Sequence, residues 1–166
     1  TLQAFANAIA GVVEWVGNLL IKWGLLNKEL SDARMQMENE SQEITKLNRE
    51  YMVANARLQA EADELRAEAA KKTEHTAKER EKMLRDAAAK EEQIFQNEVD
   101  LAYRRWQLAL QESQLTENSK EVNDKLAQYE ADYIRKRSEY AKTRRRLNRE
   151  IEATLRAQQS TAIKTA

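Results

Sequence analysis

The stretch KELSDARMQMENESQEITKLNREY, residues 28–51, places a large apolar side chain at every seventh position, at Leu30, Met37, Ile44 and Tyr51. Residues at this spacing lie along one side of an α-helix, where a neighbouring helix covers them. The same spacing links further residues on both sides of this stretch: Leu2, Ile9, Val16, Trp23, Leu58, Leu65, and, in a second series, Ile94, Leu101, Leu108, Leu115, Val122 and Tyr129. We call these residues the seam.

The composition also favours long helices. The chain of 166 residues contains no proline and no cysteine, and 34% of its residues are charged. Proline normally accompanies helix ends, so its absence argues for few breaks. A single helix cannot bury its apolar stripe alone. The sequence therefore predicts an all-α protein, a long extended helix that forms a coiled coil or helical bundle as a homo-oligomer, with a trimer favoured.

Three places interrupt this pattern with residues that cap helices, Gly24–Asn27, Thr73–Thr76 and Thr116–Ser119. Without interruption, one helix of this length would extend about 250 Å. The main structural alternative is a chain that folds back as a helical hairpin at either of the last two places.

Five regions follow from the pattern. They are an apolar helix with all three glycines (1–26), a heptad coiled coil (27–70), a polar region with a weak seam (71–86), a second heptad block (87–133) and a basic helical end (134–166). The step from Leu65 to Ala87 is three heptads plus one residue, which predicts a local change in coiled-coil winding. The apolar face of the second block is wider, which suits a bundle or trimer.

Oppositely charged residues four positions apart support a helix almost throughout the chain. Examples are Glu74/Lys78, Glu81/Arg85, Asp86/Lys90, Asp100/Arg104, Glu121/Lys125, Asp132/Lys136 and Glu152/Arg156.

The apolar opening, Leu2 to Leu26, has two interpretations. It shares the seam register of the charged region, which favours a segment packed in the same helical assembly. It is also long enough to enter a membrane, although Glu14 lies near its middle. The residues of a membrane segment would be Ile9, Val12, Val13, Trp15, Leu19, Leu20 and Trp23. A signal peptide is excluded, because no basic residue precedes the apolar run.

The sequence offers little chemistry. His75 is the only histidine, and with Glu79 it supplies too few ligands for a metal site, so we expect a solvated helix residue. There is no glycine-rich phosphate loop and no nucleophile beside a recognisable base. We therefore predict a protein that is not an enzyme, with no metal and no cofactor.

The end of the chain is basic. Ten basic and three acidic residues lie between Ile134 and Ala166. Arginines and interleaved tyrosines can contact phosphates and stack on bases, whereas the alternative is a solvated helix face. Because Arg144 to Arg146 are consecutive, we expect them to spread around the helix. The candidates for contact with an acidic surface or nucleic acid are Arg135, Arg137, Arg144, Arg145, Arg146 and Arg149, and any DNA contact is expected to be weak or incidental.

The stretch AFANAIAGVVEWVGNLLIKWGLLNKEL, leading into KELSDARMQMENESQEITKLNREY, resembles the tail tape measure proteins of long-tailed bacteriophages. The resemblance implies a long helix that fills the tail tube, sets tail length and assists DNA ejection. It implies partners among the tail tube or tail tip proteins, a place in the virion tail lumen, and transient entry into the host cell envelope and its membrane. Since the chain starts at Thr1 and not at Met, we expect a fragment of a longer polypeptide.

A second interpretation assigns the chain to another class of protein. A membrane-anchored coiled coil that acts as a stator or spacer would use Leu2–Leu26 as a permanent anchor. It would be similar in plan to the stalk subunits of rotary ATPases or to phage spanins.

Overall fold

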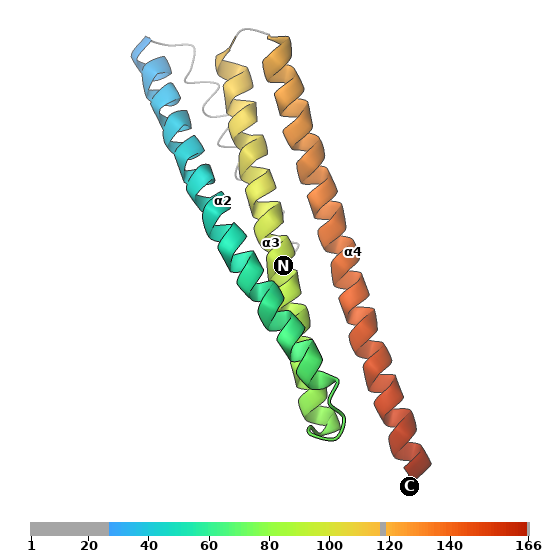
Figure 1. The fold of residues 1–166 in the computed structure, drawn as a ribbon. Coiled ribbons are helices and arrows are strands. Elements are labelled where there is room, and N and C mark those ends of the chain that lie inside the picture. Colours follow the sequence, from blue (N-terminus) through green and yellow to red (C-terminus); the bar gives the residue numbers. More distant parts are fainter. Residues whose placement is uncertain (1–26, 117–118, 166) are drawn as a thin grey trace.

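The computed structural model describes residues 27–116 and 119–165, and these form three long helices that run in alternating directions (Figure 1). Their bounds are Asn27–Ala69 for α2, Ala77–Leu115 for α3 and Lys120–Thr165 for α4. Helix α3 packs along both α2 and α4. With 1.5 Å of rise per residue, each helix is roughly 60–70 Å long. The expectation of an all-α fold is confirmed for these residues.

The single extended helix is wrong for the described chain, which folds back at both places that the sequence marked as alternatives. At the first turn, Thr76 begins α3 with a capping box. Its hydroxyl accepts the Glu79 backbone N–H at 3.2 Å, and its own N–H donates to the Glu79 carboxylate at 2.8 Å. These bonds satisfy two N–H groups that a helix start leaves without partners. The local sequence therefore stabilises a helix start at Thr76.

The second turn joins α3 to α4. Thr116 has extended backbone angles, and its hydroxyl donates to the Glu112 carbonyl at 2.6 Å, which ends α3. Ser119 then accepts the Val122 N–H at 3.3 Å and caps the start of α4. An ion pair of 2.9 Å between Lys125 and Glu112 connects the two helices across this turn.

The buried interior consists largely of small residues. Seven alanines are buried: Ala33, Ala62, Ala69, Ala87, Ala88, Ala102 and Ala109. The larger buried apolar side chains are Ile44, Val99, Leu101, Tyr133 and Leu147. Alanine lets two helix backbones approach closely and has no side-chain entropy to lose on folding. The contacts of α3 with its neighbours therefore depend on close approach along the helices more than on one large core.

The two turns also change the interpretation of two sequence features. The one-residue slip between Leu65 and Ala87 spans the end of α2 and the start of α3, so the predicted change in coiled-coil winding is wrong. The wider apolar face of the second block belongs to α3, which has a neighbour on two sides. Both features therefore arise because the chain turns back and packs its helices against one another.

Cross-helix contacts replace several of the predicted pairs along one helix. The pairs Glu81/Arg85, Asp100/Arg104 and Glu152/Arg156 are confirmed at 3.0, 3.2 and 4.0 Å. Other lysines reach a carboxylate on a neighbouring helix instead. These pairs are Lys90 with Glu61, Lys125 with Glu112 and Lys136 with Glu98. The charges of α3 therefore help to fix its position between α2 and α4.

Polar side chains also form hydrogen bonds between α2 and α3. The Tyr51 hydroxyl donates to Asp100 at 2.6 Å, and the Asn97 amide donates to Asn55 at 2.9 Å. Asn97 is buried, with 8% of its surface exposed. A buried amide pair is stable in only one alignment of two helices, since a shift leaves polar groups unsatisfied. These contacts therefore select the register of the hairpin.

The contact between Tyr51 and Asp100 gives a prediction about pH. Burial, and then the hydrogen bond to the Asp100 carboxylate, raise the pKa of Tyr51 from 10.0 to about 12. Folding therefore favours the neutral phenol, and its contribution is complete below pH 10 and lost as pH rises towards 12. We expect Tyr51→Phe to lower the free energy of unfolding by about 1.5–2 kcal/mol at pH 7.

Urea unfolding of both proteins at pH 7 and pH 11 measures this difference, which should shrink at the higher pH. Tyr129→Phe is the control, because the Tyr129 hydroxyl makes no hydrogen bond to the residues that the structure describes. An equal cost for the two variants at pH 7 would contradict the assigned role of Tyr51.

Candidate functional site

The most developed polar arrangement joins all three helices through two arginines and two glutamates. Arg66 of α2 donates from Nε to Glu91 of α3 at 2.9 Å and lies 3.5 Å from Glu150 of α4. Arg146 of α4 is 3.5 Å from Glu91 and donates to Glu150 at 2.8 Å. Each carboxylate therefore lies between two guanidinium groups. We call these four residues the charge ring.

The charge ring is partly removed from water. The Glu91 side chain is 12% exposed, and that of Arg66 is 33% exposed. Burial alone would lower the pKa of Arg66, but the hydrogen bond and charge of Glu91, with the charge of Glu150, raise it above its ordinary value. The guanidinium therefore stays charged. The charge ring fixes the positions of α2, α3 and α4 relative to one another along their length.

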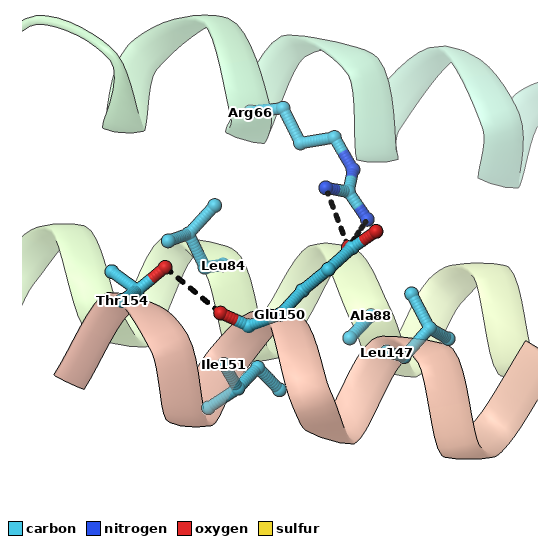
Figure 2. Close-up of a pocket in the computed structure, with 7 residues that line it drawn as sticks. All are labelled: Arg66, Leu84, Ala88, Leu147, Glu150, Ile151 and Thr154. Carbon is cyan, nitrogen blue, oxygen red and sulfur yellow. Dashed lines mark hydrogen bonds and ion pairs between the residues drawn. The ribbon is translucent and has the colours of Figure 1, made fainter. Parts of the chain in front are cut away.

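A shallow groove of about 230 Å³ lies beside the charge ring. Figure 2 shows Arg66 reaching from α2 toward Glu150 on α4, while Thr154 donates to the Glu150 carbonyl at 3.0 Å. The remaining lining residues are the apolar side chains Leu84, Ala88, Leu147 and Ile151. The charged groups of the groove neutralise one another, so the groove presents a mainly apolar wall and a paired rim.

The charge ring was not predicted, although the sequence contains one signal for it. Glu91 stands four residues after Ala87 and three before Ile94, so it shares a helix face with both of these apolar residues. A carboxylate on an apolar face requires a partner. The sequence did not show that the partners would be Arg66 and Arg146, because both come from other helices.

An aromatic cluster lies between α3 and α4. The rings of Trp106 and Tyr133 are stacked with centroids 5.2 Å apart, and Tyr103 lies 5.5 Å from Tyr133. Tyr133 is buried, and burial raises the pKa of Tyr103 and Tyr133. The Tyr140 hydroxyl donates to Glu92 on α3 at 2.8 Å. Tyr133 and Tyr140 therefore make contacts within the protein.

His75 lies in the turn between α2 and α3, so its placement on a solvated helix is wrong. Its Nε2 atom is 3.0 Å from Glu68, and the side chain is 22% exposed. Glu68, Glu74 and His75 bring together three groups of the kind that ligate metals. However, the Lys71 ammonium lies 2.7 Å from Glu68 and 3.6 Å from Glu74, where it already balances the two carboxylates. Hydrogen bonds to Lys71 and then to His75 lower the pKa of Glu68.

The basic candidates of α4 divide into three groups. Arg144 and Arg146 turn toward α3, where Arg144 lies 3.6 Å from Glu92 and Arg146 joins the charge ring. Arg135 pairs with Asp132 on its own helix. Arg137, Arg145 and Arg149 are exposed. The expected spread of Arg144 to Arg146 around the helix places Arg145 outside and its two neighbours against α3.

All seam residues in the described part of the chain are buried or half-buried: Leu30, Met37, Ile44, Tyr51, Leu58, Leu65, Ile94, Leu101, Leu108, Leu115, Val122 and Tyr129. The packing described here is between helices of one chain, and association with sister chains stays a prediction. Leu2, Ile9, Val16 and Trp23, and with them the whole candidate membrane segment, lie outside the described residues. Within residues 27–116 and 119–165, no helix combines the length and apolarity needed to cross a membrane.

Comparisons with protein-family models, with curated proteins and with solved structures find no match for this chain. The functional interpretation therefore rests on the geometry of α2, α3 and α4 and on the sequence pattern.

Proposed function

We propose that this chain is a structural spacer, a segment of the tape measure of a long phage tail that occupies the tail lumen. The observation that carries the proposal is the series of polar contacts that connect three long helices. Amide and tyrosine contacts fix α2 against α3, and the charge ring fixes all three helices at one level. Such a body has a length set by its number of residues, which is the property a molecular ruler requires.

The folded-back arrangement changes what each residue adds to that length. In an extended helix every residue contributes about 1.5 Å along the axis, whereas three antiparallel helices share the same span. A further role in DNA ejection would require the chain to leave the tail tube. It can do so if the three helices separate and pass through the tube one after another. The same proposal includes homo-oligomerisation, contacts of the basic end with the tube wall, and contacts with tail tube or tail tip proteins.

The test is the length of tails in the virus that carries this chain. Duplicating residues 27–165 should lengthen the tail by about 210 Å if the segment is extended in the particle, or by about 70 Å if it stays folded back. Electron microscopy of purified tails measures the difference. The control is a glycine- and serine-rich insertion of equal residue number, which forms no helix of fixed length. Unchanged tail length in the duplication would refute the proposal.

The second candidate, a membrane-anchored spacer, is favoured by one sequence feature, the apolar run from Leu2 to Leu26. Expression of the full chain with membranes separates the two functions. A permanent anchor remains in the pellet after a carbonate wash, whereas a packed segment is released. Retention together with unchanged tail length would replace the tape measure by the anchored spacer.

A further inference from the structure

The solvent face of α4 carries a row of basic residues that the contacts with α3 leave uncovered. Its positions alternate by three and four residues: Arg135, Ser138, Lys142, Arg145, Arg149, Glu152 and Arg156. All seven are exposed, while Tyr133 and Leu147, on the opposite side of the helix, are buried. Five of the seven positions are basic, and we call them the basic row. It extends over about 32 Å of straight helix.

Four of the five charges of this row are more available than those on the side of α4 that faces α3, while the fifth, Arg135, pairs with Asp132 on its own helix. Lys136, Arg144 and Arg146 are paired with carboxylates of α3. Among the residues that the structure describes, no carboxylate forms an ion pair with Lys142, Arg145 or Arg149. Arg156 has only a contact of 4.0 Å with Glu152, between two largely exposed side chains. Internal pairing has therefore sorted the basic end into a neutralised inner side and a cationic outer side.

We propose that the basic row binds the phosphate backbone of double-stranded nucleic acid without reading its sequence. A row of cations along one face of a helix complements a polymer that presents regularly spaced negative charges along its length. Because the row belongs to α4 alone, the inference holds whether or not the chain is a tape measure.

The composition of the row distinguishes this partner from three others. It contains no aromatic residue, and single-stranded nucleic acid is usually held by stacking on aromatic rings. It contains no large apolar residue that would insert into a lipid surface. It also lacks the buried aromatic or apolar anchor at the centre of most protein interfaces. Backbone phosphates are the partner that needs only charge.

The experiment compares two matched triple variants of the full chain. The first carries Lys142→Gln, Arg145→Gln and Arg149→Gln in the basic row. The control carries Lys46→Gln, Arg49→Gln and Arg57→Gln on the exposed surface of α2, and removes the same charges from the same residue types. Fluorescence anisotropy with a mixed-sequence duplex of 30 base pairs measures affinity between 50 and 200 mM salt, and circular dichroism compares helix content.

Five phosphate contacts predict a slope of about −4.5 for log affinity against log salt, a loss of roughly 500-fold over this range. Removing three contacts should reduce the slope to about −2 and weaken binding at low salt by roughly tenfold or more. The control variant should retain the wild-type slope and affinity. This combination, with unchanged helix content, supports the proposal.

Four results would overturn it. One is an equal loss in the two triple variants, which would assign binding to net charge. Another is duplex affinity that the row variant leaves unchanged. A third is tighter binding of a single strand of equal length. The last is binding to vesicles containing phosphatidylserine that depends on the row and that the duplex does not displace.

Discussion

An Ile44→Asp variant is expected to lose roughly 3–5 kcal/mol of stability and to separate α2 from α3. Ile44 is 6% exposed, and α2 packs along α3. A carboxylate at this position would have to shed its water shell without a cation to balance it. Urea unfolding followed by far-ultraviolet circular dichroism measures the loss, which should appear as a lower midpoint of unfolding.

Met52→Asp provides the matched control on the same helix. Met52 is 66% exposed, so a carboxylate there remains hydrated, and we expect a change within about 0.5 kcal/mol. Sedimentation of both variants also tests association between chains. If Ile44→Asp kept its full helix content and stability but lowered the mass of an oligomer, the seam would pack between chains and not within one.

A Leu147→Ala variant is expected to lower the free energy of unfolding by about 2–4 kcal/mol. Leu147 is 2% exposed and lines the groove beside the charge ring. Its truncation removes apolar contacts from α4 and enlarges that groove. The exposed residue Ile134 of the same helix supplies the comparison, because Ile134→Ala removes a side chain that is 59% exposed.

Chemical denaturation of the two alanine variants gives the two free energies. The expected result is a clear loss for Leu147→Ala and a change below about 0.5 kcal/mol for Ile134→Ala. Equal, small effects would mean that α4 is held to α3 by its ion pairs and aromatic cluster, with little contribution from this apolar position.

Local chemistry predicted the helix ends well. Thr76 and Ser119 cap the starts of α3 and α4, and both lie within stretches where the sequence shows clustered capping residues. Capping depends on atoms within four residues of one another, so a short window contains most of the information. The same stretches gave a reversal of the chain only as an alternative, since a capped start is compatible with several approach angles.

The sequence did not predict the polar contacts between helices, because the partners are distant from one another in sequence. Tyr51 was assigned to the seam as a large apolar residue, yet its hydroxyl binds Asp100, which is 49 residues away in sequence. Similarly, the sequence predicted that Arg144, Arg145 and Arg146 would spread around their helix, but only the position of α3 decided that Arg144 and Arg146 meet its carboxylates. A side chain's charge is fixed by its type, but its partner depends on which helix lies opposite.

The sequence by itself determined that the described chain is helical and which face of each helix is covered. Seven-residue spacing of apolar side chains indicates a buried face, because residues on one face of a helix are covered together. The spacing is the same whether a helix of the same chain or of another chain covers them. Only the tertiary structure decided that α3 supplies this cover to α2 and α4 within the chain. Closure of a short turn brings these faces together at a small entropic cost, and contacts between residues distant in sequence then select the register.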